Sequence, residues 1–307
     1  MDPLLVVLLG PTGSGKTTLS LSLGRAFSGE ILSCDSVAVY RGMEIGTAKP
    51  TPAERQTVPH HLIDILPPDQ PFTAGDYSRL GRQALGEITA RHRLPIVTGG
   101  TGLYLRALLE GLFAGPQRSE ELRIRLRAGA RRHPSGWLHR VLRRLDLAAA
   151  ARIHPNDESK LIRALEVCLA ARRPITVAWQ EGRNPLTGYR ILRIGLDPPR
   201  AQLYARLDAR AATMFAQGLI QETDTLLSEY GDAPRAFDAL GYRQARAVLR
   251  GEWTEAKAIA ATQQGHRNYA KRQLTWFRRE PDVHWLPSFG DDPDLVRQAR
   301  ALVEQNR

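Results

Sequence analysis

The chain has little cysteine and no long hydrophobic run, and each absence excludes a class of protein. Its two cysteines, Cys34 and Cys168, cannot build a disulfide framework or a cysteine-based metal site, so a reducing compartment is indicated. No apolar run approaches the roughly 18 residues that a membrane-spanning helix needs. We therefore expect a cytoplasmic protein without a membrane span.

The apolar run at residues 4–9 has some likeness to the core of a signal peptide. However, Asp2 stands where such a core usually has a positive flank, and cleavage would destroy the glycine-rich loop that follows. We expect this run to be part of the folded protein. No internal repeat or low-complexity tract is present, and 42% hydrophobic with 24% charged residues is typical of globular chains.

Positive charge is abundant and unevenly distributed. The chain has 43 Lys and Arg against 32 Asp and Glu, a formal net charge of +11. Residues 116–195 contain 17 Lys and Arg against 7 Asp and Glu, so +10 of this charge lies in that segment. Such a concentration favours a dedicated nucleic-acid surface over general basicity.

A phosphate-binding loop follows the first apolar run, and a leucine-rich, helix-like stretch follows the loop. Its spacing, G-x-x-x-x-G-K-T, is that of the P-loop, in which backbone N–H groups and a helix N-terminus bind phosphate oxygens. Its residues are Gly10, Pro11, Thr12, Gly13, Ser14, Gly15, Lys16 and Thr17. In this motif the lysine adds a mobile positive charge and the final hydroxyl binds Mg²⁺. The motif predicts a phosphorylated ligand, but ATP and other diphosphates present the same oxygens.

Strands and helices alternate around this loop, which predicts an α/β fold: a doubly wound, mostly parallel sheet. Strands are expected at residues 4–9, 30–36, 94–98 and 189–196, and a helix at 72–91. Residues 40–71 are rich in Pro, Gly and Thr and should form a long functional loop with little helix. We interpret His60 and His61 in it as a hydrogen-bonded loop corner, not a metal site, because no third ligand is nearby.

The basic segment is expected to form a helical insertion without strands. Its helices are expected at residues 120–132, 137–145 and 159–172. The domain prediction is thus a P-loop catalytic core of residues 1–115 and 189–307 with a helical insertion of residues 116–188. Further core helices are expected at residues 202–217, 219–228, 242–249 and 254–277.

Asp35 follows the second expected strand, at the edge where open parallel sheets bind ligands. The strand at 94–98 ends in Thr98 and Gly99, without the carboxylate that P-loop ATPases use to hold Mg²⁺. Position alone leaves three roles open for Asp35: magnesium holder, general base or loop cap. A second glycine-rich turn, residues 99–102, should open at the same edge.

Taken together, the motifs resemble those of the bacterial tRNA dimethylallyltransferases. They occur in family order over almost the whole chain, whereas the P-loop alone would fit many unrelated enzymes. Besides the P-loop they are Cys34-Asp35-Ser36 with Tyr40, GMEIGTAKP at 42–50, PHHLID at 59–64, GGTGLY at 99–104, RIHPND at 152–157, RALEV at 163–167, GYRQ at 241–244 and KRQLTW at 271–276.

This resemblance implies transfer of the dimethylallyl group from dimethylallyl diphosphate to N6 of adenosine 37 in the tRNA anticodon stem-loop. The product is N6-(dimethylallyl)adenosine. The P-loop, with Lys16 and with Mg²⁺ on Thr17, would hold the leaving diphosphate. Asp35 would be the general base, and Thr101 would lie near the reacting amine. Arg210, the second arginine of R-x-x-x-R, would clamp the diphosphate, although an exposed helix arginine fits the sequence equally well.

The same resemblance implies a set of tRNA contacts. They are Asp35, Ser36, Val37, Ala38, Thr101, Arg123, Ser159, Lys160, Leu161, Ile162, Arg163, Ala239, Leu240, Gly241, Tyr242 and Arg243. Many relatives have Gln in place of Ala38, so this chain lacks an amide side chain there.

Two other functions fit parts of the sequence. A P-loop kinase of a nucleoside-like substrate would use Asp35 as a base toward a hydroxyl, but it leaves the basic insertion unexplained. A non-catalytic RNA-binding protein with a nucleotide switch does not explain Asp35 or the second glycine-rich turn. For the enzyme we expect a monomer that binds tRNA, dimethylallyl diphosphate and Mg²⁺, and no membrane.

Overall fold

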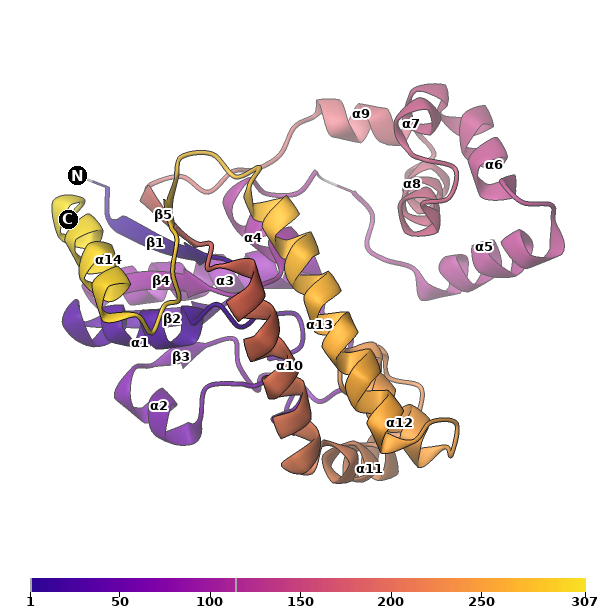
Figure 1. The fold of residues 1–307 in the computed structure, drawn as a ribbon. Helices are drawn as coiled ribbons and strands as arrows, with labels where there is room; N and C mark the ends of the chain where they lie inside the picture. Colours follow the sequence, from indigo (N-terminus) through magenta and orange to yellow (C-terminus); the bar gives the residue numbers. More distant parts are fainter. Residues whose placement is uncertain (1, 114) are drawn as a thin grey trace. The chain divides into compact units, whose positions relative to one another are not determined.

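Six strands form one parallel sheet among the residues that this computed structural model describes, 2–113 and 115–307 (Figure 1). Their order is β3-β2-β4-β1-β5-β6, and each pairing is parallel. The strands are β1 (Leu4–Leu9), β2 (Gly29–Ser33), β3 (His60–His61), β4 (Leu94–Thr98), β5 (Arg190–Leu196) and β6 (Val283–Leu286). The predicted α/β fold class is confirmed.

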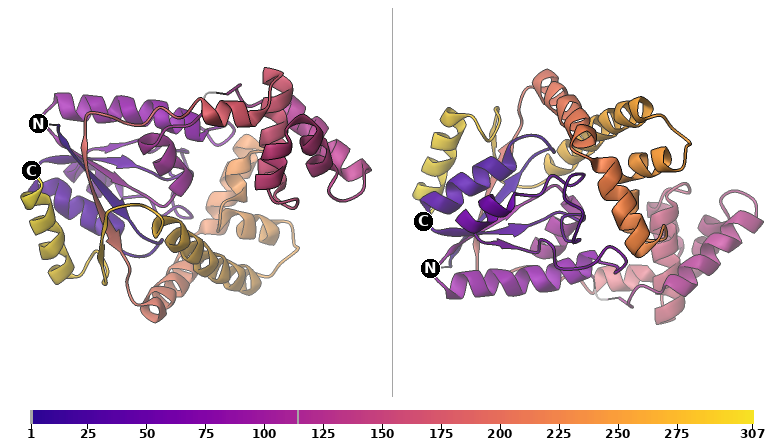
Figure 2. Two further views of the ribbon diagram at one scale, coloured as in Figure 1. Left: turned by 90° about the horizontal axis from the view of Figure 1, so that it is seen from above. Right: turned by 90° about the horizontal axis from the view of Figure 1, so that it is seen from below.

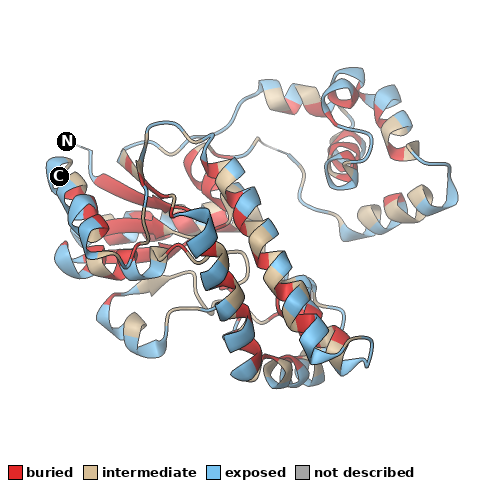
Figure 3. Cartoon of the chain, in the orientation of Figure 1, coloured by how far each residue is buried: buried red, intermediate tan, exposed pale blue. Residues whose placement is uncertain are grey.

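Helices cover both faces of this sheet, which explains the unbroken apolar sequence of β1. All six β1 residues are buried (Figure 3). One face of β1 packs against α1 (Lys16–Ala26) and α14 (Pro293–Gln305), and the other packs against α3 (Ala74–Ala90) and α4 (Gly102–Leu109). Burying each Leu or Val side chain contributes about 1.5–3 kcal/mol to folding stability, so burial strongly stabilises the strand that leads into the P-loop.

A group of helices follows β5 in the chain. It consists of α10 (Arg200–Ala216), α11 (Leu219–Tyr230), the 3-10 helix η1 (Arg235–Asp238), α12 (Tyr242–Leu249) and α13 (Glu255–Phe277). Figures 1 and 2 show α10 and α13 side by side. Leu207 of α10 packs with Ala270 of α13, and the Gln263 amide donates a 3.2 Å hydrogen bond to the carbonyl oxygen of Asp208. This pair of helices carries side chains to the phosphate-binding loop.

Residues 110–185 form a second compact unit, separate from the unit of residues 1–109 and 186–307. Its helices are α5 (Glu120–Arg132), α6 (Trp137–Leu145), α7 (Leu147–Arg152), α8 (Glu158–Ala171) and α9 (Ile175–Gln180). Leu126, Leu142 and Leu165 belong to its own hydrophobic core. This helical unit begins and ends a few residues before the insertion expected from the sequence.

The segment from residue 40 to 71 is more ordered than predicted. It contains a short helix, α2 (Pro52–Thr57), whose first turn is capped by the Thr51 hydroxyl. His60 and His61 form the edge strand β3 beside β2, so the expectation of a loop corner was wrong. Both are hydrogen-bonded, His60 Nδ1 to the Val58 carbonyl oxygen and His61 Nε2 to Glu30.

Several elements were not predicted, namely the short elements α2, β3, α7, α9, η1 and β6 and the 13-residue terminal helix α14. In the described part of the chain, no helix combines the length and apolarity needed to cross a membrane.

Candidate active site

The P-loop, residues 10–17, connects β1 to α1 at the carboxyl edge of the sheet. Gly13 and Gly15 have φ angles of +78° and +87°, the left-handed region that favours glycine. A Cβ on Gly15 would lie 2.7 Å from the Gly290 nitrogen, so the close approach of these two backbone segments also requires glycine at this position. No side chain caps the N-terminus of α1. Its first N–H groups are therefore available to an anion.

Lys16 is folded back onto the loop that carries it. Its Nζ donates hydrogen bonds of 2.8 and 2.7 Å to the carbonyl oxygens of Gly10 and Pro11. Burial and, to a smaller extent, the charge of Arg210 lower the pKa of Lys16 to about 7, against the opposing charge of Asp35. An arriving anion would stabilise the charged ammonium.

Beside the P-loop lies a cavity of about 310 Å³. Its lining combines residues that are far apart in the sequence but all belong to the larger unit. They include Thr12, Gly13, Gly15, Lys16, Thr17, Asp35, Ala38, residues 47–50, His60, Ile63, Gly99, Gly100, Arg206, Arg210, Tyr269 and Gln273. The size suits a small phosphorylated ligand.

Asp35 lies two residues beyond β2 and faces this cavity. Its Oδ1 accepts hydrogen bonds from the backbone N–H groups of Val37 (2.8 Å) and Ala38 (3.1 Å). One carboxylate oxygen therefore caps the turn at residues 35–38. No described residue donates a hydrogen bond to Oδ2, so capping and acting as a base are compatible.

Thr101 supports the same turn from the second glycine-rich loop. Its Oγ1 accepts a 3.1 Å hydrogen bond from the Ser36 N–H, and its own N–H donates to the Cys34 carbonyl oxygen. Gly99 and Gly100 line the large cavity beside the P-loop, whereas Thr101 is not among its lining residues. In this conformation the threonine holds the loop that carries Asp35.

Arg210 extends from α10 to the cavity. Burial lowers its pKa, whereas the charge of Asp35 raises it. Its Nε is buried without a hydrogen-bond partner. Arg206, one turn earlier, is engaged by Asp291 through two 3.0 Å hydrogen bonds and lies over the Phe289 ring. Of the two arginines in R-x-x-x-R, Arg210 is thus the one with unused donor capacity facing the cavity.

Two residues of α13, Gln273 and Tyr269, were not predicted as site residues, although Gln273 lies in the KRQLTW motif. The Gln273 side chain is 4% exposed and lines the cavity. Its Oε1 accepts the Thr12 N–H at 2.7 Å, and its Nε2 donates to the Gly100 carbonyl oxygen at 2.9 Å. The Tyr269 hydroxyl donates to the same oxygen at 3.3 Å. The available signal was the position of Gln273 on the same helix face as Ala270 and Phe277, because an amide side chain on an apolar face needs partners.

Comparison with known proteins adds an independent observation to this geometry. A family model described as IPP transferase matches residues 38–280, and one described as isopentenyl transferase matches residues 3–70. A tRNA dimethylallyltransferase of Koribacter versatilis is 63% identical over 303 residues, 99% of each chain. That of Solibacter usitatus is 52% identical over 300 residues, 97% of each chain.

The chain belongs to the tRNA dimethylallyltransferase family. The crystal structure of a full-length tRNA isopentenylpyrophosphate transferase from Bacillus halodurans agrees in fold, with a TM-score of 0.72 and 37% identity. The match covers 99% of this chain and 98% of that one. Membership of this family of transferases argues against the kinase and the non-catalytic alternatives.

Some of the residues expected to contact tRNA have buried side chains in the described conformation. Leu161 and Ile162 are each 1% exposed and lie in the core of the helical unit. Tyr242 is fully buried, and its hydroxyl donates a 2.6 Å hydrogen bond to Glu222. Ala38 and Gly241 are buried too, although Ala38 lines the cavity beside the P-loop. These positions are packed because each lies on the inward face of its helix or turn.

Among the other expected contacts, Ser159, Lys160 and Arg243 are exposed, and Lys160 also pairs with Asp157. Arg123 and Arg163 both pair with the buried carboxylate of Glu166. The two arginines and the Ser119 N–H lower the pKa of Glu166, outweighing its burial. In the helical unit, these two therefore stabilise the fold, and the exposed arginines are the better candidates for contact with RNA.

Proposed function

We propose that this chain transfers the dimethylallyl group of dimethylallyl diphosphate to N6 of adenosine 37 in tRNA. The observation that carries the proposal is the charge arrangement in the cavity. Lys16 and Arg210 line it as cations, and Asp35 alone is acidic among the described residues of its lining. The cavity thus combines a place for a polyanionic leaving group with one proton acceptor.

The diphosphate would bind at the N-terminus of α1. The open backbone N–H groups there and the Arg210 guanidinium would donate to its oxygens. Lys16 would exchange the carbonyl oxygens of Gly10 and Pro11 for phosphate oxygens, which are stronger acceptors. These interactions strengthen as the C1–O bond stretches and negative charge accumulates on the leaving diphosphate.

The donor set fits a Mg²⁺ ion that arrives with the diphosphate. Thr17 is exposed in the cavity next to Asp35. No cluster of three or more His, Cys, Asp or Glu among the described residues could hold a metal alone. Mg²⁺ typically takes few protein oxygens, several waters and phosphate oxygens. When bound, the ion would neutralise charge on the leaving group.

Asp35 would act on the nucleophile, by accepting the proton that the adenine N6 amine loses. The C1–O bond breaks with its electron pair remaining on the diphosphate, the N6–C1 bond forms, and the N6 proton moves to Asp35. The adenine amine is a weak nucleophile, so a carboxylate within hydrogen-bond reach lowers the barrier. Oδ2 has no competing donor among the described residues and would receive the proton.

The exposed arginines of the helical unit would provide the tRNA surface. Arg131 and Arg132 of α5 and Arg143 and Arg144 of α6 are exposed. Such residues contact the phosphate backbone, while the adenine itself must leave its stack to react.

One experiment tests the whole proposal. The purified protein is incubated with dimethylallyl diphosphate, Mg²⁺ and unmodified tRNA, and the nucleosides are analysed by mass spectrometry. We expect N6-(dimethylallyl)adenosine at the position next to the anticodon. Absence of this product, with ATP consumed and a phosphorylated nucleoside formed instead, would overturn the proposal in favour of a kinase.

A further inference from the structure

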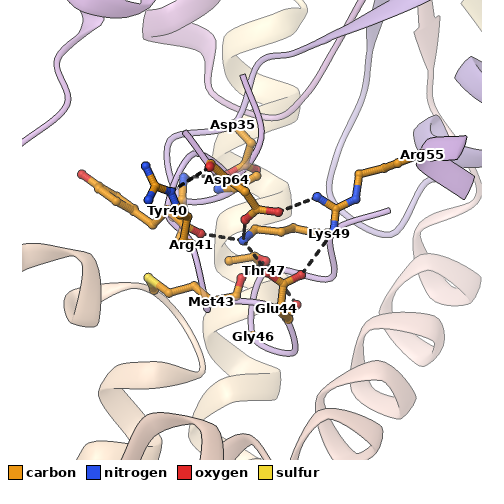
Figure 4. Close-up of polar contacts among 12 residues, drawn as sticks. Asp35, Tyr40, Arg41, Met43, Glu44, Gly46, Thr47, Lys49, Arg55 and Asp64 are labelled. Atoms are coloured by element: carbon orange, nitrogen blue, oxygen red, sulfur yellow. Dashed lines mark hydrogen bonds and ion pairs between the residues drawn. The ribbon is translucent and has the colours of Figure 1, made fainter. Parts of the chain in front are cut away.

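Two motifs found in the sequence have no role in diphosphate binding or proton transfer: GMEIGTAKP at 42–50 and PHHLID at 59–64. The structure brings them together next to Asp35 (Figure 4). Residues 47–50 of the first motif and His60 and Ile63 of the second line the cavity. A lysine lies near the end of the first motif and an aspartate ends the second, and neither has a part in the proposed reaction.

Lys49 joins the two motifs through its ammonium group. The side chain is 1% exposed, and its Nζ donates to three oxygens. These are the Tyr40 carbonyl oxygen at 2.6 Å, Glu44 Oε1 at 3.0 Å and Asp64 Oδ1 at 2.5 Å. An ammonium has three N–H donors, so all of them are used. Arg55 pairs with the other oxygen of Asp64.

Because all three of its N–H donors are used, Lys49 differs from the cations of the proposed diphosphate site. Lys16 contacts only neutral carbonyl oxygens, and Arg210 has a buried Nε without a partner. Lys49 is instead neutralised by two carboxylates. A substrate anion would have to displace both of them, so Lys49 is not a diphosphate ligand.

A continuous path of hydrogen bonds leads from Lys49 to the Asp35 carboxylate. Lys49 holds the side chain of Asp64, and the Asp64 N–H donates to the Ala38 carbonyl oxygen at 3.1 Å. The Ala38 N–H in turn donates to Asp35 Oδ1 at 3.1 Å. The second contact of Lys49, to Tyr40, holds the other end of the same turn.

The backbone of Asp64 requires this support. Its φ angle is +56°, a left-handed conformation that residues other than glycine seldom adopt, although Asp tolerates it better than most. Lys49 and Arg55 each form an ion pair with one oxygen of its carboxylate, and these contacts keep its N–H directed at the Ala38 carbonyl oxygen. Strained conformations of this kind persist only when the surroundings hold them.

We propose that Lys49 is a positioning residue for Asp35, acting through Asp64 and the turn at residues 35–40 without touching either substrate. The inference rests on the proposed role of Asp35 as general base. Its consequence is specific: loss of Lys49 should slow proton transfer without weakening the binding of the diphosphate.

The test is a double-mutant cycle with Lys49→Met and Asp35→Ala, measured in single-turnover prenylation of tRNA. Lys49→Met alone should lower kcat at least tenfold, with KM for dimethylallyl diphosphate and binding of inorganic pyrophosphate changed less than threefold. In the Asp35→Ala background, the same Lys49→Met change should cause little further loss, because the group it positions is gone. A general structural defect would instead reduce the rate by the same factor in both backgrounds.

Two further variants keep the test decisive. Asp64→Asn removes the charge while keeping the shape, and it should reproduce the kcat loss if Lys49→Met folds poorly. Lys257→Met, which alters an exposed lysine on α13, should leave all parameters unchanged. A raised KM with unchanged kcat, or additive losses in the cycle, would overturn the inference. Failure of the wild-type protein to prenylate tRNA would overturn the proposed function instead, so the two failures are distinguishable.

Discussion

The backbone N–H of Thr12 donates a 2.7 Å hydrogen bond to Oε1 of Gln273, which lies 261 residues further along the chain. Through its Nε2, the same side chain donates to the Gly100 carbonyl oxygen. One amide therefore joins the P-loop to the second glycine-rich turn. A Cβ at Gly100 would lie 2.1 Å from Nε2, so the glycine is needed to admit the contact.

Replacing this amide by a hydrocarbon should damage both stability and diphosphate binding. Gln273→Leu leaves the Thr12 N–H without its partner, at a cost of about 1–3 kcal/mol, and leaves the Gly100 carbonyl oxygen with the 3.3 Å hydrogen bond from the Tyr269 hydroxyl alone. We expect the free energy of unfolding in urea to fall and KM for dimethylallyl diphosphate to rise. Gln264→Leu, which alters an exposed glutamine on the same helix, is the matched control. Equal behaviour of the two variants would argue against the joining role.

Asp35 has two functions that one pair of variants can separate. Asp35→Asn keeps an oxygen to cap the turn but cannot accept a proton, so kcat should fall by about 10²–10⁴ while stability and tRNA binding are retained. Asp35→Ala should lose the cap as well and be less stable to heat. The measurements are single-turnover kinetics, tRNA binding and thermal unfolding. If Asp35→Asn kept wild-type turnover, the base assignment would be wrong.

Lys16 should take up a proton when the diphosphate binds. Burial lowers its pKa to about 7, so above that pH much of the free protein has a neutral amine. A bound anion restores the charge, and the affinity for pyrophosphate should weaken as pH rises above 7. Calorimetry at pH 8 in buffers of different ionisation enthalpy measures the uptake.

Lys16→Arg is the control, because a guanidinium stays charged and the pyrophosphate's own protonation is common to both proteins. The uptake should be larger in the wild type, and identical values would refute the prediction. The same low pKa means that burying the charged lysine opposes folding below pH 7, and this penalty fades as pH rises from 7 toward the ordinary lysine pKa.

Glu166 should be essential to the stability of the helical unit. Its fully buried carboxylate pairs with Arg123 and Arg163 and accepts the Ser119 N–H at 2.7 Å. Glu166→Ala leaves buried charge uncompensated and should cost about 3–5 kcal/mol. Faster hydrogen exchange confined to residues 110–185 would show the effect. Because its pKa is lowered in the folded state, stability should be lost as pH falls below the ordinary glutamate pKa.

Charge reversal on α6 should weaken tRNA binding without affecting the diphosphate. Arg143→Glu with Arg144→Glu should reduce affinity and make the dependence of log K on log salt shallower, by about 0.7–0.9 for each phosphate that is no longer neutralised. Pyrophosphate binding is the internal control, and Arg297→Glu on α14 is the control for charge alone. An unchanged salt slope would exclude this face of the helix as the tRNA surface.

Local signals in the sequence were sufficient to place the P-loop and Asp35 at the same edge of the sheet. The P-loop is defined by glycines and a lysine within eight residues, and Asp35 follows from the rule that ligands bind at strand ends. The helices at Glu120–Arg132 and Trp137–Leu145 have the expected bounds because their apolar periodicity is strong. The edge strands β3 and β6 were missed because they are short and lack a sustained pattern.

The sequence did not predict which side chains would contact each other when the two residues lie far apart in the chain. Gln273 with Thr12, Lys49 with Asp64 and Arg123 with Glu166 are set by tertiary packing, and no local pattern identifies them. The expected tRNA contacts at Leu161 and Ile162 came from a contiguous family segment. Both side chains lie on the face of α8 that packs into the core of the helical unit, so helical geometry turns them inward.

The close approach of Gly15 to Gly290 has a consequence for how the protein can be altered. The Gly290 N–H donates a 2.8 Å hydrogen bond to the Ser14 carbonyl oxygen, and Asp291 holds Arg206 at the rim of the cavity. The segment between β6 and α14 therefore supports the proposed phosphate site, although it is separated from the P-loop by most of the chain. Deleting α14, or fusing a partner so that it shifts this segment, would act as an active-site mutation.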